Sequence, residues 1–391
     1  MKKPTITENT KLREGKMKIK TISTVVVDMP LTRPHVMSLM TVKEVNYLFV
    51  RIEAENGLAG WGETSFLGGP TWSEESVESA QAIVNTYVGP FLIGKEAEEI
   101  EGLRHLMETL VRGNHFAQAA VELALWDLLG KLRGLPVYEL LGGKVRDKVP
   151  LSWSLASGTL EAEMKEAEKM AAKGGFIFKF KTGLLSPEED AARIKNIRQA
   201  FPKARLRADA NQGWDRFNAI KAIRLFEDYN LDFVEQPVPK TDMDSLVAIA
   251  KSTSIPLLAD ESLESLQAAT QLVKREAVGM FGIKLSKAGG LLGAKRLAAI
   301  AEGASFPCYV GSMMESPLCN AAHLHFACST PAVTMGCELF GPMLLADELT
   351  EEQSIFKEGY ICLDDPKPGF GITMREEKIR QYQREPFYHI R

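Results

Sequence analysis

Short apolar runs alternate with charged, amphipathic stretches from about Val149 onwards, and this rhythm constrains the fold more than any other feature. The runs include FIFKFK, RLRADA, LDFVEQ, IPLLAD and GMFGIKL, and they recur at roughly the 25–30-residue strand-plus-helix spacing of an eightfold barrel. Such alternation predicts parallel βα units. Polar residues close the runs, and no GxGxxG follows a strand. The sequence therefore predicts a barrel rather than an open, doubly wound dinucleotide-binding sheet.

The first part of the chain has a different pattern. Residues 18–28 and 45–54 are strand-like, and Asn56-Gly57 after them is typical of a hairpin turn. Residues 74–133 have helical spacing, which ends at Gly134-Leu135-Pro136. This order predicts an α+β domain. The expected division is a polar extension (1–16), an α+β domain (17–147), a β/α barrel (148–345) and a segment that packs back onto the first domain (346–391).

Composition excludes several classes of function. The 391 residues carry a formal net charge of −4 and show no basic run, so we expect no nucleic-acid partner. No apolar stretch is long enough to span a membrane, and the polar N-terminus does not have the pattern of a secretory signal. The five cysteines show no CxxC pairing, which favours reduced thiols in a cytoplasmic protein.

Three acids close three successive apolar runs: Asp209, Glu235 and Asp260. One such acid is usually a helix cap, but three on consecutive strands indicate a shared site at one rim of the barrel. An all-oxygen set favours Mg²⁺ or Mn²⁺ over zinc. We expect Asn211 and Glu261 to orient a ligand or touch substrate, although one residue of the cluster around Asp260 could instead cap a helix.

Lysines flank these acids. Lys179 and Lys181 alternate with phenylalanines within an apolar run, so both are expected to face the barrel interior. A buried lysine is costly unless it is paired or functional, and two adjacent ammonium groups should lower each other's pKa, as suits a general base. Lys284 could approach a bound carbon from the opposite face, whereas Lys287 is expected past the strand end.

Together these residues resemble the muconate-lactonizing subgroup of the enolase superfamily over nearly the whole chain after residue 17. The KxK element, the Asp/Glu/Asp triple and the IKxxKxGG run are specific to that subgroup's barrel. Further similar stretches are RPHVMSLMT (33–41), GETSFLGG (62–69), GNHFAQAAVE (113–122), SWSLASG (152–158) and CELFGPMLL (337–345).

The resemblance implies a capping domain over a (β/α)7β barrel of the TIM type. It also implies that the three acids bind Mg²⁺ or Mn²⁺, that Lys181 and Lys284 are an acid/base pair, and that Lys179 supports the substrate carboxylate or the pKa of Lys181. Glu315 falls where subgroup members carry a site glutamate. A homo-oligomer, often an octamer, is expected.

Two capping-domain loops, 31–43 and 64–74, are implied to close over the substrate. Their candidate substrate-facing residues are Arg33, His35, Phe66, Thr71 and Trp72. Arg33 and His35 could meet a distal substrate carboxylate, and Trp72 could shield the site from water.

The activity implied is the interconversion of cis,cis-muconate, or a substituted muconate, and a muconolactone. A divalent cation would stabilise an enediolate while a lysine moves the proton. Two alternatives use the same groups: racemisation or epimerisation of N-acylamino acids, dipeptides or betaines, and dehydration as in o-succinylbenzoate synthesis. A non-catalytic barrel is a poor alternative, since a scaffold does not need buried lysines.

Overall fold

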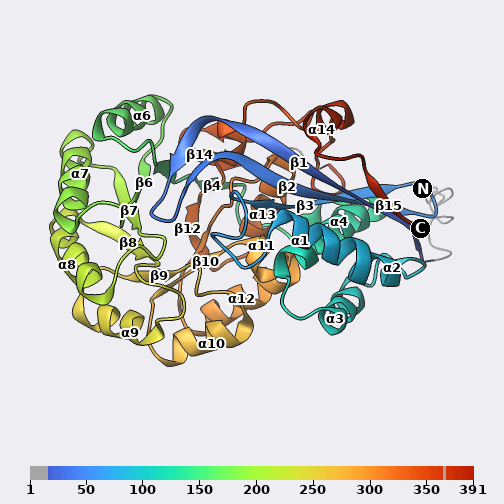
Figure 1. Cartoon of the computed structure of the whole chain (residues 1–391), viewed down its shortest axis with the longest axis horizontal. Helices are drawn as coiled ribbons and strands as arrows, with labels where there is room; N and C mark the ends of the chain where they lie inside the picture. The colour runs from blue at the N-terminus through green and yellow to red at the C-terminus, as the bar shows by residue number, and fades with distance from the viewer. Residues whose placement is uncertain (1–15, 364–366) are drawn as a thin grey trace, which may run out of the picture.

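The computed structural model describes residues 16–363 and 367–391. Figure 1 shows two bodies: a barrel ringed by helices and a long twisted sheet beside it that carries its own helices. The expected 1–16 extension lies outside the described residues except Lys16, which pairs with Glu96 at 2.7 Å. Among the described residues, no helix is long and apolar enough to cross a membrane.

The capping domain is built on a four-stranded antiparallel sheet in the order β15-β1-β2-β3. Its strands are β1 (Ile19–Val36), β2 (Thr41–Ala54), β3 (Ala59–Phe66) and β15 (Tyr388–Ile390). The expected hairpin at Asn56-Gly57 joins β2 to β3. Asn56 Oδ1 accepts a hydrogen bond from Leu58 N within that turn.

Helices cover this sheet on the side of the barrel. They are α1 (Val77–Ile83), the π-helix η1 (Val84–Val88), α2 (Gly89–Leu92), α3 (Ile100–Leu110), α4 (His115–Arg133) and α5 (Val137–Leu140). The helix α4 is buried on nearly all sides. It packs against β3 at two glycines, where a Cβ on Gly60 would lie 2.2 Å from Ala124 O and one on Gly62 would lie 2.0 Å from Ala120 O. No larger residue fits there, so the two glycines fix how closely the helix approaches the sheet.

Eight parallel strands form the barrel sheet, ordered along the chain. They are β5 (Trp153–Leu155), β6 (Ile177–Lys181), β7 (Arg205–Asp209), β8 (Leu231–Glu235), β9 (Leu257–Ala259), β10 (Met280–Ile283), β11 (Cys308–Val310) and β12 (Val333–Cys337). A parallel bridge between Leu151 and Cys337 joins the two edges of the sheet. The expected barrel is therefore confirmed.

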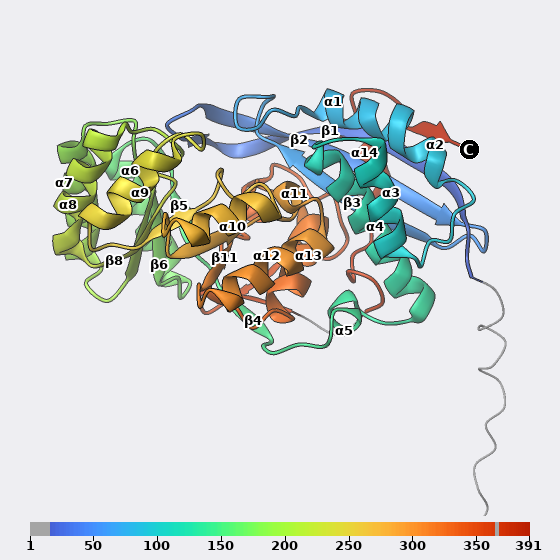
Figure 2. The same cartoon turned by 90° about the horizontal axis from the view of Figure 1, so that it is seen from below.

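Helices and short turns connect the barrel strands and form its outer ring (Figure 2). They are α6 (Leu160–Ala172), α7 (Pro187–Ala200), α8 (Arg216–Phe226), η2 (Glu227–Tyr229), α9 (Met243–Ser252), α10 (Leu266–Lys274), α11 (Leu285–Ala288), α12 (Leu291–Gly303) and α13 (Pro317–Cys328), and the short helix η3 (Gly341–Leu344) follows the last strand. The helix α7 begins with a capping box in which Ser186 Oγ accepts from Glu189 N and the Glu189 carboxylate accepts from Ser186 N. Its start thus follows from local sequence.

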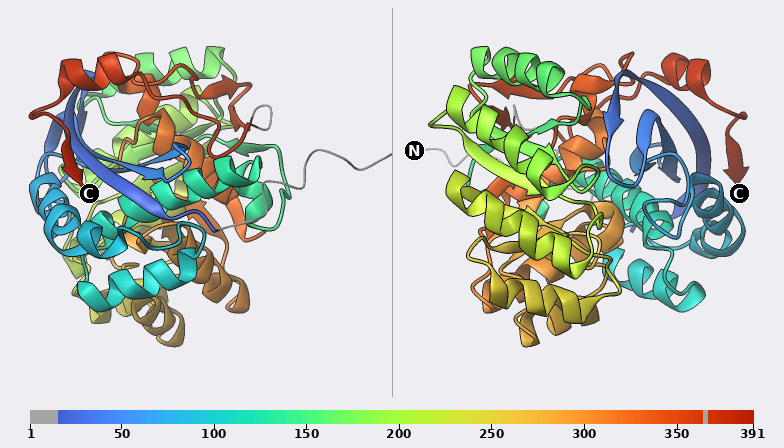
Figure 3. Two further views of the ribbon diagram at one scale, coloured as in Figure 1. Left: turned by 90° about the vertical axis from the view of Figure 1, so that its right-hand side faces the viewer. Right: turned by 60° about the vertical axis from the view of Figure 1, so that its left-hand side comes forward.

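The C-terminal segment returns to the capping domain. Its α14 (Glu376–Tyr382) leads into β15, which pairs with β1 and lies beside the blue strands in Figure 3. Before that, β13 (Ile355–Lys357) and β14 (Tyr360–Cys362) form a small antiparallel sheet with β4 (Lys148–Pro150). The thiols of Cys308, Cys319, Cys328 and Cys337 are free and buried.

The β1–β2 hairpin reaches from the capping sheet to the mouth of the barrel (Figure 1). Residues 31–43 were expected to be a loop, but β1 continues to Val36 and β2 starts at Thr41, so only the tip is irregular. Antiparallel pairing of His35 with Val42 holds the two arms together. The barrel mouth is thus covered on this side by a hairpin.

Candidate active site

The three acids end neighbouring strands or follow them directly at one rim of the barrel. Asp209 ends β7 and Glu235 ends β8, and the strand register places them side by side. Asp260 directly follows β9. All three side chains are buried, at 1 % exposed or less. Parallel strands present their C-terminal residues on one rim, which brings together acids that are about one βα unit apart in sequence.

Lys179 lies deepest and is surrounded by acids. Its Nζ donates to Asp209 Oδ2 (3.1 Å) and Glu235 Oε2 (2.7 Å), and it pairs with Glu338 Oε2 at 2.6 Å. Burial alone would lower the pKa of Lys179, but the three carboxylates outweigh it and hold that pKa well above its usual value. We expected Lys179 and Lys181 to lower each other's pKa. For Lys179 this prediction is wrong, because its nearest charges are negative.

Lys181 lies nearer the opening of the barrel, two residues along the same face of β6. Its Nζ donates to Asp209 Oδ2 (2.6 Å) and Asn211 Oδ1 (2.8 Å). The Asn211 amide in turn donates to Glu261 Oε1 at 3.2 Å. The other Glu261 oxygen is buried and has no hydrogen-bond partner within residues 16–363 and 367–391. Burial, together with Asp260 and Asp209, raises the pKa of Glu261 to about 7. Asn211 thus contacts Lys181, and Glu261 contacts Asn211. That these two residues orient a ligand or touch substrate stays a prediction.

Lys284 and Lys287 hold the third acid. Lys284 Nζ donates to Asp260 Oδ2 (2.7 Å), and Lys287 Nζ donates to Asp260 Oδ1 (2.6 Å) and to the Asp260 carbonyl. The paired lysines outweigh burial and hold the pKa of Asp260 far below its usual range. Lys287 was expected past the strand end, and it does lie in α11, but its ammonium reaches back to the site.

The two candidate acid/base lysines face each other across the barrel. Lys181 is on β6 and Lys284 follows β10, four strands further round an eight-stranded sheet. Both line a cavity of about 20 Å³ with Asp209 and Asn211. A space of this size holds about one water molecule. Any larger substrate therefore requires the covering residues to move.

The capping domain supplies the roof of this cavity. Leu67 and Trp72, from the segment between β3 and α1, line it together with His35 and Met37 from the β1–β2 hairpin. The Lys284 ammonium lies 4.3 Å from the centroid of the Trp72 ring, a cation–π contact. His35 is 2 % exposed, and its Nδ1 has no hydrogen-bond partner among the described residues. Burial, then Lys181, lowers the pKa of His35 well below its usual value.

Three expected lid residues do not line this cavity. The Arg33 guanidinium pairs with Glu166 on α6 at 2.7 Å and donates to Ser154 O, so it fastens the hairpin to the barrel instead of facing a substrate. Phe66 is stacked on Phe116 in the core of the capping domain. Thr71 is exposed. The predicted substrate-facing role of these three residues is therefore not supported, because side-chain direction depends on where each strand ends.

Glu315 lies beneath the rim, where it shapes a loop. Its carboxylate accepts from Ser312 Oγ (2.6 Å) and Met313 N (2.8 Å), and it is fully buried. Ser312 and Met314, on the same loop, line the cavity. Glu315 therefore acts on the cavity wall through its neighbours.

Sequence reasoning gave no role to Glu338, which directly follows β12 and reaches Lys179. It also lines the cavity. The sequence pattern that identified the other acids also applies to Glu338, because this carboxylate closes the strand-like run TMGCE.

The donor chemistry of this rim fits a hard divalent cation. Burial, then the neighbouring Asp209, raises the pKa of Glu235 well above its usual value, although Lys179 pairs with this carboxylate. In the part of the chain that the structure describes, no three acidic, His or Cys side chains converge at metal-ligand spacing. The lysine ammonium groups lie between the carboxylates.

Comparison with known families gives two matches that together cover most of the chain. The mandelate racemase / muconate lactonizing enzyme N-terminal domain matches residues 20–142, and the enolase C-terminal domain-like family matches residues 162–378. These segments contain the capping sheet strands β1–β3 and all the charged residues of the rim.

Curated relatives match along their whole length. A chloromuconate cycloisomerase of Pseudomonas putida is 40% identical, over 94% of this chain and 100% of the relative. Muconate cycloisomerase 1 of Rhodococcus opacus is 35% identical, over 94% of this chain and 99% of the relative.

Solved structures give the same result. A muconate lactonizing enzyme from Pseudomonas fluorescens complexed with muconolactone matches with a TM-score of 0.92 and 34% identity, over 95% of this chain and 100% of that one. An N-succinyl Arg/Lys racemase from Bacillus cereus matches with a TM-score of 0.91 and 33% identity, over 96% of this chain and 100% of that one. The fold is therefore shared by two different activities.

Proposed function

The chain belongs to the mandelate racemase / muconate lactonizing enzyme family of the enolase superfamily, and on that premise we propose that it is a cycloisomerase. It would interconvert cis,cis-muconate, or a substituted muconate, and a muconolactone. The observation that carries this proposal is the 40% identity to a chloromuconate cycloisomerase over 94% of the chain. The enzymes similar to it along their whole length include several more cycloisomerases of muconate or chloromuconate.

Homologues of this kind imply a divalent cation, and we assign its ligands to Asp209, Glu235 and Asp260, with Mg²⁺ or Mn²⁺ as the ion. When bound, such an ion supplies positive charge to a substrate carboxylate whose neighbouring carbon gains or loses a proton. The three acids suit it because they are buried at the ends of neighbouring strands and offer only oxygen donors. Lys179 would hold Asp209 and Glu235 in place, because it pairs with both of them as well as with Glu338.

The proton would be held and moved by the lysines that line the cavity. Lys181 and Lys284 approach from opposite sides, and each is oriented by one acid of the cluster. In a lactonization one of them delivers the proton to the carbon while the other acts as electrostatic support. The Trp72 ring would shield one side of the Lys284 ammonium from water.

The distal half of the substrate would lie under the capping domain. Since Arg33 is tied to Glu166, we assign the distal polar contact to His35, whose buried Nδ1 has no partner in the described part of the chain. Burial keeps this imidazole neutral, so it would offer a hydrogen bond rather than a charge. Both Trp72 and Phe340 would provide an apolar wall.

A racemase or epimerase of N-acylamino acids is the second candidate. Two lysines on opposite sides of one cavity are what racemisation at a single carbon requires. The similarity to the N-succinyl Arg/Lys racemase, with a TM-score of 0.91, favours it specifically.

One assay separates the two candidates. The protein is tested with Mg²⁺ or Mn²⁺ on cis,cis-muconate, on chloromuconates, and on a panel of N-acylamino acids and dipeptides. We expect kcat/KM above about 10⁴ M⁻¹s⁻¹ on a muconate, within the usual range for an enzyme's own substrate. A higher value on any acylamino acid overturns the cycloisomerase assignment and leaves the site residues in place.

Solvent-deuterium exchange assigns the lysines. With muconolactone, we expect either Lys181→Ala or Lys284→Ala to abolish all exchange and the other to leave exchange at one position. Exchange at the wild-type rate in both variants would exclude both lysines as the base.

For the assembly we propose a cytoplasmic homo-oligomer, with an octamer as the expected size. Light scattering of the purified protein tests the size.

A further inference from the structure

A buried ion pair connects the capping domain to the barrel segment that carries Lys284. Arg104 on α3 and Glu122 on α4 pair at 2.6 Å between Nη1 and Oε2, and they are 8 % and 0 % exposed. Removing two charges from water is costly unless both make further good contacts. The other contacts of these two residues show which part of the molecule the pair holds in place.

Those contacts lie largely on the backbone that follows Lys284. Arg104 donates to Gly289 O (2.8 Å) and Ala288 O (3.2 Å), which end α11. Glu122 Oε1 accepts from Leu292 N at 2.8 Å, in the first turn of α12. The pair thus holds the end of one helix and the start of the next, so it fixes the turn between them.

Lys284 is the residue from which α11 begins, one helical turn before Ala288. Ala288 N donates to Lys284 O (3.1 Å) and Gly290 N donates to Leu285 O (2.8 Å), so the turn is internally bonded. At its start, Leu285 N donates to His323 Nε2 at 3.1 Å. With both ends held, the Lys284 backbone has a fixed position relative to the cavity.

The turn between α11 and α12 has a glycine, Gly290, at the point where Glu122 approaches it. Gly290 has φ +115, and a Cβ there would lie 2.5 Å from the carboxylate of Glu122. That backbone conformation and that clearance both require glycine. The GG of IKLSKAGG therefore admits a carboxylate that comes from another domain.

We propose that the Arg104–Glu122 pair is a positioning element for catalysis: it holds the α11 turn so that the Lys284 ammonium stays against Asp260 and Trp72. The inference rests on the proposed function in assigning proton transfer to Lys284. Neither Arg104 nor Glu122 lines the cavity at the rim, so each acts through Lys284.

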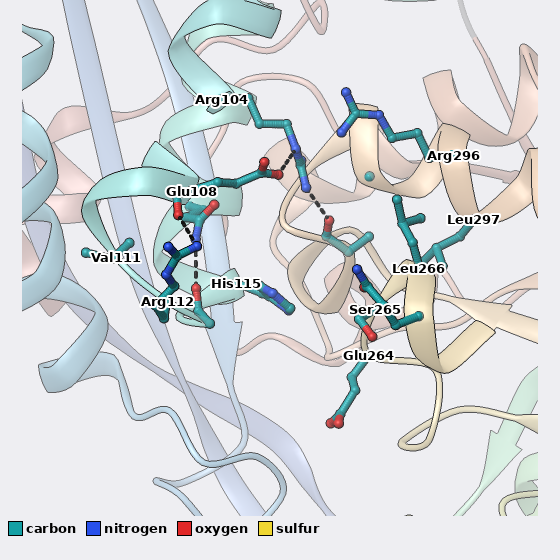
Figure 4. A pocket seen from close by; sticks show the side chains of 15 residues that line it. Arg104, Glu108, Val111, Arg112, His115, Glu264, Ser265, Leu266, Arg296 and Leu297 are labelled. Atoms are coloured by element: carbon teal, nitrogen blue, oxygen red, sulfur yellow. Dashed lines mark hydrogen bonds and ion pairs between the residues drawn. The ribbon is translucent and has the colours of Figure 1, made fainter. Parts of the chain in front are cut away.

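Arg104 borders a cleft on its outer side. Arg104 lies in the wall of a cleft of about 360 Å³, between α3 and α4 on one side and α10 and α12 on the other. Figure 4 shows Arg104 reaching across this cleft, with Glu108 on its own side and a barrel carbonyl on the other. A small cation added to the solution can therefore reach the place that a truncated Arg104 would leave empty.

The test compares Arg104→Ala with a matched control. Asp127→Asn breaks another buried pair of α4, Asp127–Lys131 at 2.6 Å, whose further contacts are with Trp61 N and Phe370 N rather than the barrel turn. We expect Arg104→Ala to lower kcat roughly 10- to 100-fold, as a displaced catalytic group does. KM should change little, and the pH profile of kcat should shift because Lys284 loses its fixed surroundings.

Guanidinium at millimolar concentration should restore a measurable part of the Arg104→Ala kcat, whereas sodium at equal ionic strength should not. Arg104→Lys should retain more activity than the alanine variant. Asp127→Asn should keep kcat and the pH profile close to wild type, even though it also lowers the melting temperature. Equal losses of kcat in the Arg104 and Asp127 variants, measured below both melting temperatures, would overturn the proposal.

Hydrogen exchange gives a readout that needs no substrate. The amides of residues 285–292 should lose protection in Arg104→Ala and keep it in Asp127→Asn. If their protection in Arg104→Ala is the same as in the wild type, the positioning role is overturned, whatever the substrate. If Arg104→Ala does not fold, Glu122→Gln, which keeps the side-chain shape, replaces it with the same expectations for kcat, KM and hydrogen exchange. A wild-type protein inactive on every substrate above would contradict the proposed function, and the exchange result would still decide this inference.

Discussion

At the scale of single residues, the site is a network of buried opposite charges. Each lysine of the rim contacts at least one carboxylate, and Asp260 is shared between two lysines. A buried charge left without its partner is strongly unfavourable. The lysines therefore hold the acids in place before any substrate arrives.

Removing one acid should separate function from folding. Glu235→Gln keeps the shape of the side chain, and Lys179 retains Asp209 and Glu338 as partners. We expect loss of cation-dependent turnover with an unchanged far-UV circular dichroism spectrum. Full activity of the wild type in EDTA would contradict the metal assignment.

A second residue-scale prediction concerns acid stability. Burial lowers the pKa of His325 from 6.5 to about 4, and its Nδ1 accepts from Tyr138 N. Between those pH values the unfolded chain binds a proton that the folded chain does not, so the free energy of unfolding falls as pH falls. The total loss approaches roughly 3 kcal/mol, at about 1.4 kcal/mol per pH unit.

Denaturant unfolding at several pH values measures this loss. His325→Gln is expected to be less stable than wild type at neutral pH, because a buried contact is altered. The difference between the free energies of unfolding of the two proteins should narrow as the pH falls from 6.5 towards 4. A difference that stays constant over that range would show that His325 is not the titrating group.

At the scale of elements, the segment between β3 and α1 is fastened at its base. Lys240, after β8, pairs with Glu74 at 2.5 Å and with Glu264 at 2.8 Å. Glu75, which follows Glu74 in the chain, accepts hydrogen bonds from two amides in the first turn of α4, Phe116 N and Ala117 N. Leu67 and Trp72 of this segment therefore lie over the cavity, while its base is tied to both domains.

Lys240→Met should loosen that base. The pair is partly exposed, so its contribution is about 1 kcal/mol or less. We expect faster hydrogen exchange in residues 67–75 and a change of kcat/KM of severalfold at most, which is smaller at high salt. Lys221→Met, which breaks the exposed Lys221–Glu188 pair on the outer helices, is the control, and equal exchange in both variants would contradict the fastening role.

At the scale of the whole molecule, the C-terminal strand completes the capping sheet. β15 pairs with β1 over Ile22, Ser23 and Thr24, and Ile390 is buried. Gly89 on α2 is in close contact with Ile390, because a Cβ there would lie 2.4 Å from it. The end of the chain therefore protects an edge of the first sheet.

Truncation after Glu385 should expose that edge. An unpaired strand edge is a template for pairing between molecules. We expect a lower melting temperature and concentration-dependent aggregation, measured by light scattering, with the barrel helices still present by circular dichroism. A truncated protein as soluble and as stable as the full chain would contradict this role of β15.

Much of the fold and the candidate site could be predicted from local sequence. The alternation of apolar and amphipathic runs predicted the eight-stranded barrel, and the helix stop at Gly134 was also found. Because residues that close parallel strands share one rim, Asp209, Glu235, Asp260, Lys181 and Lys284 could be placed together without coordinates. Their catalytic roles stay predictions.

Tertiary structure alone decided which charge each group faces. Arg33 pairs with Glu166, Lys179 with Glu338, and Arg104 with Glu122, and the two members of a pair lie up to 159 residues apart in the chain. Such pairings depend on strand order, on where strands end and on side-chain direction. Periodicity in the sequence specifies which face a residue lies on, whereas its partner across a barrel or between two domains is fixed only when the whole chain has packed.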